Sequence, residues 1–96
     1  MEVSAWRSDG TYGIRIGRPN VKRYFPSSVR TIKIKLDGKF YEFALSKTFW
    51  KTCPEIRGKQ ICEWFRKRNL LQWPKGRPPH FNLASRGKGL YKLARL

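Results

Sequence analysis

Basic side chains are the residues of this chain whose types and spacing could do binding chemistry. One set lies between residues 59 and 67, where a helical wheel places it opposite the apolar positions: Lys59, Gln60, Arg66 and Lys67. Lysine and arginine bond guanine edges and phosphates, and glutamine bonds adenine. The set predicts a helix face that contacts nucleic acid, although an ordinary solvated helix face has the same composition.

A second basic set occupies the tip of a predicted hairpin, where Arg86 and Lys88 each precede a glycine. Glycine has no side chain and lets a backbone approach closely. The 33 residues after Glu63 hold nine lysines and arginines and no acid, so nothing nearby balances this tip. We therefore expect it to contact phosphates or a minor groove.

The third basic set is Lys75 and Arg77, inside the segment WPKGRPPHF. Prolines stiffen this segment, so side chains held outward on it would lose little entropy on binding. We expect Trp73 and Phe81 to anchor its ends in the core. Lys75 and Arg77 are then a secondary contact beside the other two sets.

Catalytic and metal-binding constellations are missing from the sequence. The acids are scattered, at Glu2, Asp9, Asp37, Glu42, Glu55 and Glu63. Two cysteines and a single histidine fit no zinc spacing, and no glycine-rich phosphate loop occurs. We expect no enzymatic activity, no metal and no cofactor.

The charge balance points to the class of partner. Against 6 acids the chain has 22 lysines and arginines, a net charge of +16. Such an excess opposes compaction unless a polyanion neutralises it, and nucleic acid is the partner we expect. The alternatives are a solvated basic surface and a membrane surface. We expect no membrane partner, because no segment pairs a long apolar face with a lysine-rich one.

Length and composition predict one folded domain. Its 96 residues suffice for a single modest core, and four Trp, four Tyr and six Phe argue against disorder. No apolar run is long enough to span a bilayer and the N-terminus lacks the apolar region of a signal peptide. We expect an intracellular protein, in the cytoplasm and nucleoid or in a nucleus, either whole or part of a larger protein or complex.

The elements that must position these residues begin with strands. Residues 12–16 alternate apolar side chains with Gly and Arg, as a half-buried strand does, and residues 17–28 read as a loop. Between residues 29 and 45, Asp37-Gly38 predicts a type I′ hairpin in which Ile34 faces Tyr41 and Ile32 faces Phe43.

Helices follow the hairpin. Ser46 is a predicted N-cap for a helix at residues 47–52, and Thr52 with Glu55 forms a predicted capping box for a helix at about 54–69. Prolines exclude a helix from residues 70–79, and a hairpin resumes at His80. The predicted fold class is α+β: a small antiparallel sheet with two consecutive helices on one face.

In element order, two closely spaced helices followed by a basic hairpin resemble a winged helix-turn-helix over about half the chain. A strand feeding a short helix, FALSKTFW, is similar to the B3-type DNA-binding domains over fewer than ten residues. The first resemblance implies major-groove docking by the second helix. The predicted function is therefore non-catalytic binding of nucleic acid, with duplex DNA favoured over RNA.

Other functions stay open at this point. The chain could be a ribosome-associated or other basic domain bound to RNA or to an acidic protein. It could also be the recognition module of a restriction or modification system that reads a modified or flipped base in an aromatic pocket.

Overall fold

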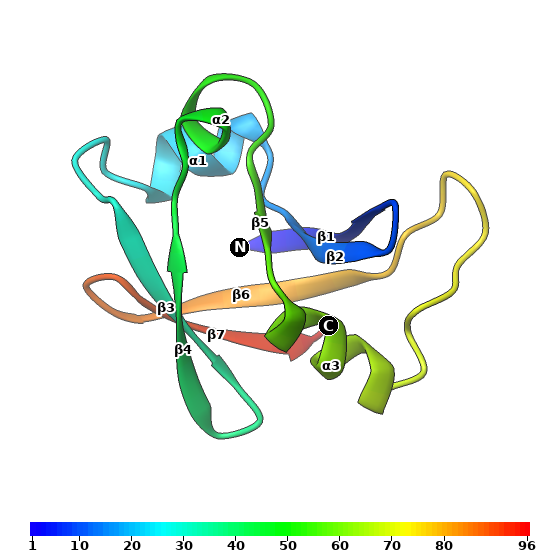
Figure 1. Ribbon diagram of the computed structural model, residues 1–96. Helices are drawn as coiled ribbons and strands as arrows, with labels where there is room; N and C mark the ends of the chain where they lie inside the picture. The colour runs from blue at the N-terminus through cyan, green and yellow to red at the C-terminus, as the bar shows by residue number, and fades with distance from the viewer.

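The computed structural model describes all 96 residues, in seven strands and three helices (Figure 1). In chain order these are β1 (Glu2–Ser8), β2 (Thr11–Arg15), α1 (Arg18–Tyr24), β3 (Thr31–Leu36), β4 (Lys39–Ala44), α2 (Lys47–Lys51), β5 (Glu55–Arg57), α3 (Lys59–Lys67), β6 (His80–Gly87) and β7 (Leu90–Arg95).

Two Asp-Gly turns set the register of the first two hairpins. Asp37 and Gly38 both have positive φ, 52° and 84°, as a type I′ turn requires. The predicted register is confirmed, because Ile34 lies opposite Tyr41 and Ile32 opposite Phe43. Asp9, with φ of 49°, and Gly10 join β1 to β2 in the same way.

The sheet is mixed and has seven strands in the order β4-β3-β7-β6-β1-β2-β5. All neighbours are antiparallel except β3 and β7, which run parallel. The prediction of a small antiparallel sheet is therefore corrected in size and in type. Parallel strands need a long crossover, and the residues between β3 and β7, which include α2, α3 and β6, supply it.

The sheet curls around its core instead of presenting one face to both helices. α3 packs on β2 and on β3, which stand near opposite ends of the strand order. A Cβ on Gly58, just after β5, would lie 3.0 Å from the ring of Phe43 on β4, so the two edges approach each other. The 19 buried apolar residues form one cluster inside this curl.

Helices close the two ends of the curled sheet (Figure 1). α1 and α2 lie together at one end, and α3 lies at the other. The predicted placement of two helices on one face is wrong. The hydrophobic interior is open at both ends of a curled sheet, so each end needs its own apolar cover.

Separate aromatic clusters fill these ends. At the α3 end, ring centroids lie 5.2–6.5 Å apart among Tyr12, Trp64, Phe65, Trp73 and Phe81. At the other end they lie 5.1–5.5 Å apart among Phe25, Phe49, Trp50 and Tyr91. These distances suit offset and edge-to-face packing.

The predicted helix at 54–69 is shorter, since its first residues form β5. Ile56 is 2% exposed and pairs with Ile14 of β2, so the segment gains burial of its apolar side chain together with a strand pairing. Glu55 does not cap a helix; its carboxylate forms an ion pair across the sheet with Arg15, with 3.5 Å between Oε2 and Nε. Because β5 separates α2 from α3, no helix-turn-helix forms.

Local signals explain the remaining helices. The predicted Ser46 cap is confirmed, because its hydroxyl accepts the Phe49 amide at 3.3 Å. Residues 17–28, predicted as a loop, contain α1, which has a proline in its first turn, where the missing amide costs nothing. None of the three helices is both long and apolar enough to cross a membrane.

Candidate nucleic-acid interface

The predicted binding residues occupy three separate regions of the structure. Lys59, Gln60, Arg66 and Lys67 lie on α3, Lys75 and Arg77 on the 70–79 loop, and Arg86 and Lys88 at the β6–β7 tip. Figure 1 places the hairpin tip on one side of the molecule and the loop and α3 on the other. One flat surface therefore does not contain all eight.

The α3 face carries charges of both signs. The prediction that α3 turns its basic residues outward and its apolar ones inward is confirmed. Lys59, Gln60 and Lys67 line a groove of about 560 Å³ that also contains Asp37 and Glu63. Arg66 donates to Glu63 at 3.0 Å, and this hydrogen bond raises the pKa of the arginine. These two acids thus neutralise part of the positive charge on the α3 face.

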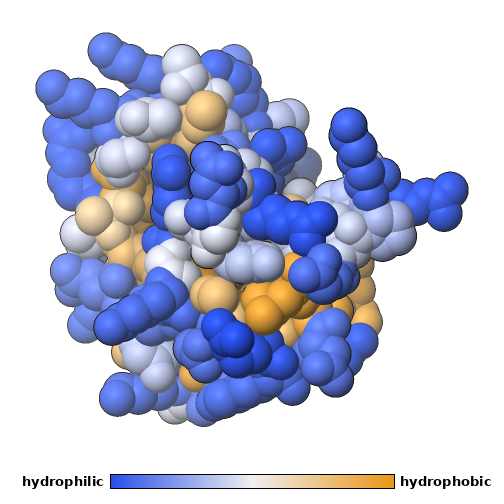
Figure 2. All heavy atoms as spheres, turned by 45° about the vertical axis from the view of Figure 1, so that its right-hand side comes forward, coloured by the Kyte–Doolittle hydropathy of each residue, from blue (hydrophilic) through white to orange (hydrophobic).

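The 70–79 loop is anchored as predicted. Trp73 packs edge-to-face on Tyr12 and on Phe65, and Phe81 is 1% exposed. Arg7 stacks over Trp73 at 4.3 Å and donates to the carbonyl oxygens of Leu71 and Trp73. On the intervening turn, the side chains of Lys75 and Arg77 are exposed. Figure 2 shows hydrophilic side chains projecting on this side of the molecule, with hydrophobic atoms between them.

A group of cations without neighbouring acids lies at the α1–α2 end. Three hollows of about 450, 330 and 270 Å³ adjoin there, since the first shares Ser27 and Trp50 with the second and Pro26 with the third. No acid lines any of the three. We call the surface around these three neighbouring hollows the basic groove; its charged residues are Arg18, Lys22, Arg30, Lys47, Lys51 and Lys88.

Acidic residues are paired elsewhere, which is why the basic groove keeps its charge. The four ion pairs are Arg15–Glu55, Arg66–Glu63, Arg68–Asp37 and His80–Glu2. The other two acids, Asp9 and Glu42, lie in the β1–β2 turn and on β4. Because no neighbouring carboxylate neutralises the groove cations, their positive potential can attract an external anion.

Packing beneath the groove holds its walls in place. Phe25, directly after α1, stacks on Tyr91 of β7 at 5.4 Å and tilts against Phe49 of α2 at 5.5 Å. Arg18 also ties the first turn of α1 to the last residue of α2, because its guanidinium donates to the carbonyl oxygen of Lys51 at 2.6 Å. Packing and hydrogen bonding thus hold the groove in one conformation.

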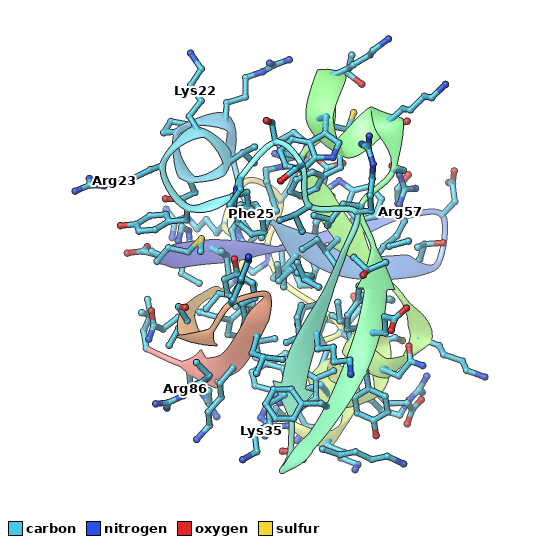
Figure 3. All side chains as sticks on the ribbon, turned by 90° about the vertical axis from the view of Figure 1, so that its left-hand side faces the viewer. Lys22, Arg23, Phe25, Lys35, Arg57 and Arg86 are labelled. Atoms are coloured by element: carbon cyan, nitrogen blue, oxygen red, sulfur yellow. The ribbon has the colours of Figure 1, made fainter.

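Figure 3 views the molecule from the side of the hairpin tip. Lys22 and Arg23 project outward from α1, and Arg86 projects from the hairpin below them, whereas Phe25 points inward. Arg86 thus shares a side of the molecule with α1, and Lys88 lines the same hollow as Tyr24 of α1. Of the eight predicted residues, Lys88 lines the basic groove, and Arg86 lies beside it, between Ser85 and Gly87 of the lining.

The basic groove was missed in sequence because its cations come from separate segments, at 18–30, 47–51 and 88. Reading residues 17–28 as a loop hid the helix that carries Lys22. A signal was available, since Gly17 followed by a proline two residues later is typical of a helix start. Nothing local, however, places that helix beside α2.

Comparisons with known proteins identify no relative. The chain matches no protein-family model, no curated protein and no solved structure. The structure contains no group of three or more His, Cys, Asp or Glu side chains that could hold a metal ion.

Proposed function

We propose that the protein binds nucleic acid, without catalysing a reaction on it, through the basic groove and the adjacent Arg86–Lys88 tip. The observation that carries this proposal is the set of six lysines and arginines around neighbouring hollows that no acid lines. A string of cations along a groove suits a partner with charges along a chain. A phosphate backbone is such a partner, and each contact releases counterions.

The structure changes which nucleic acid is favoured. The preference for duplex DNA depended on two consecutive helices and a wing, and β5 separates those helices. α3 also carries Glu63 on its solvent face and joins a groove with Asp37, and both acids would repel phosphates. The basic groove is concave and has an aromatic wall, which suits a single strand better than a rigid duplex.

Lysine substitutions on opposite ends of the molecule test this proposal. One variant combines Lys22→Ala, Lys47→Ala and Lys51→Ala in the basic groove. Its matched control combines Lys59→Ala, Lys67→Ala and Lys75→Ala, which removes the same charge from equally exposed side chains. Binding to a labelled oligonucleotide is measured by fluorescence anisotropy between about 50 and 200 mM salt.

We expect the groove variant to bind more weakly and to reduce the slope of log affinity against log salt by about 2, because three phosphate contacts are lost. The control should change that slope by less than about 1. Equal losses in both variants would show that net charge, and not the groove, drives binding. Tighter binding to polyglutamate than to any polynucleotide would assign the groove to an acidic protein.

A further inference from the structure

A pocket within the basic groove has the composition of a site for a flat, partly apolar group. This hollow of about 450 Å³ lies between α1 and α2, and we call it the α1–α2 pocket. Its lining is Arg18, Val21, Lys22, Phe25, Pro26, Ser27, Phe49, Trp50 and Pro54. Small-molecule sites in proteins have volumes of this size and a similar mixture of aromatic walls with a few polar groups.

The aromatic residues of the pocket differ in exposure: two form its buried floor, and the third forms a partly open wall. Phe25 and Phe49 are 5% and 2% exposed and are held in the core. Trp50 is half-buried and meets Phe49 edge-to-face at 5.1 Å. The partly open ring is therefore the one available for stacking, and the buried rings keep it in position.

The indole nitrogen of Trp50 is the single buried side-chain nitrogen or oxygen that has no hydrogen-bond partner. Buried donors are nearly always paired, so an unpaired one calls for an explanation. Because this nitrogen has almost no accessible surface, an acceptor on a ligand could pair it only if the side chain of Trp50 turned toward the pocket. Ring nitrogens and carbonyl oxygens of nucleobases are such acceptors.

Charges around the pocket suit a group that is flanked by anions. Arg18 and Lys22 belong to its lining, and Arg30, Lys47 and Lys51 line the adjoining hollow across Ser27 and Trp50. Neither hollow contains an acid. A nucleotide within a strand combines these properties, because its base is flat and its phosphates continue on both sides.

We propose that the α1–α2 pocket receives one unstacked base of a nucleic acid, stacked on Trp50, while lysines beside the pocket hold the neighbouring phosphates. The inference rests on the proposed function, since the groove must first bind the backbone. A fully paired duplex offers no such base. A single strand offers one directly, and a duplex with an unpaired base offers one by extrusion.

Oligonucleotides that differ in bases but not in phosphates test the pocket. We compare an intact single strand, the same strand with abasic sites throughout, a fully paired duplex and a duplex with one unpaired base. The intact strand should bind at least about tenfold more tightly than the abasic strand, as base stacking on an aromatic side chain predicts. The paired duplex should bind like the abasic strand, and the unpaired base should restore part of the difference.

Protein variants assign this difference to Trp50. Trp50→Leu should bring the ratio of intact to abasic affinity close to one, and Trp50→Phe, which keeps a ring but lacks the donor, should give an intermediate ratio. Trp6→Phe is the matched control, because Trp6 is half-buried beside Arg57, outside the pocket lining, and should leave the ratio unchanged. Thermal unfolding checks that each variant is folded.

Photocrosslinking provides a measurement that needs no variant. A strand containing 5-iodouracil is cross-linked to the unchanged protein, and the modified peptide is identified by mass spectrometry. Modification within residues 18–27 or 47–54 supports the proposal. Modification confined to Trp6 or Trp73 overturns it.

Failure of this inference can be distinguished from failure of the proposed function. Equal, salt-dependent binding of intact and abasic strands overturns the base pocket and leaves backbone binding in place. Absence of binding to every polynucleotide overturns both. Tighter binding of an acidic peptide that contains tyrosine than of any oligonucleotide would assign the pocket to a protein partner.

Discussion

At the scale of single residues, Asp37 joins turn formation to a tertiary ion pair. Its positive φ belongs to the β3–β4 turn, and both of its carboxylate oxygens accept hydrogen bonds from Arg68 at the end of α3. This hydrogen bonding holds the pKa of Asp37 below its usual range. A lowered folded-state pKa stabilises the protein above the unfolded carboxyl pKa, and that stability is lost as the pH falls through the folded value.

We predict that Asp37→Asn lowers the free energy of unfolding at about pH 7 by less than about 1 kcal/mol, because the pair is partly exposed and screened by solvent. The turn itself should survive, since Asn accepts positive φ. Near pH 2 the difference between variant and parent should be smaller, because the stabilisation from a lowered carboxyl pKa is lost as the pH falls below the unfolded value. Urea denaturation at both pH values measures this.

Asp9→Asn is the control for this prediction. Asp9 has a similar φ, 49°, and precedes Gly10 in an equivalent turn, but it forms no ion pair. Its substitution should leave stability at pH 7 nearly unchanged. A loss equal to that of Asp37→Asn would show that Arg68 contributes nothing.

At the scale of elements, the pairing of β5 with β2 depends on a glycine. Gly13 is buried opposite Arg57, and a Cβ there would lie 2.4 Å from the carbonyl oxygen of Ile56 and 2.9 Å from the Cα of Arg57. These are backbone atoms, so a changed rotamer cannot relieve the overlap. β5 has only three residues, and a small displacement would cost it most of its pairing.

Gly13→Ala should therefore destabilise the protein by about 3 kcal/mol, through overpacking and lost pairing of β5. Chemical denaturation measures this loss, and hydrogen exchange locates it at the Ile56 amide and at the Gly58 amide, which donates to the carbonyl oxygen of Tyr12. Thr11→Ala, at an exposed position of the same strand, should change stability by less than about 0.5 kcal/mol. If Gly13→Ala proves as stable as the parent, β5 is not held against β2.

At the scale of the whole molecule, the net charge of +16 leaves most cations without a carboxylate partner. All four ion pairs lie outside the basic groove, so its six cations repel one another without compensation. Counterions screen such repulsion. Salt should therefore have opposite effects on folding and on binding.

We predict that the melting temperature rises between about 50 and 200 mM salt while affinity for oligonucleotides falls over the same range. A saturating oligonucleotide should also raise the melting temperature, because it binds the folded state: at about 100 times its Kd the gain is about 2.7 kcal/mol. Differential scanning fluorimetry measures both effects. A melting temperature that falls with added salt would contradict the proposed repulsion.

Much of the local structure could be predicted from sequence because short-range rules determine it. Asp37-Gly38 predicted a turn and, with it, the register of both strands. Ser46 predicted a helix start, and the helical wheel predicted that α3 buries its apolar face, which holds Ile61, Trp64 and Phe65. A capping box at Thr52 and Glu55 misled the prediction, because pairing between Ile56 and a strand about forty residues away outweighed a local helix signal.

The sequence predicted that the candidate site is a basic surface, but it did not predict where on the molecule that surface lies. By itself the sequence determined the excess of positive charge, the scarcity of acids, the Arg86–Lys88 tip and an aromatic-rich core, since these follow from composition and local pattern. Only the tertiary structure decided where charge remains free, because it pairs acids with bases from distant segments. It also gathered Lys22, Lys47 and Lys88 around one groove, because α1, α2 and the β6–β7 hairpin meet where the curled sheet must be covered.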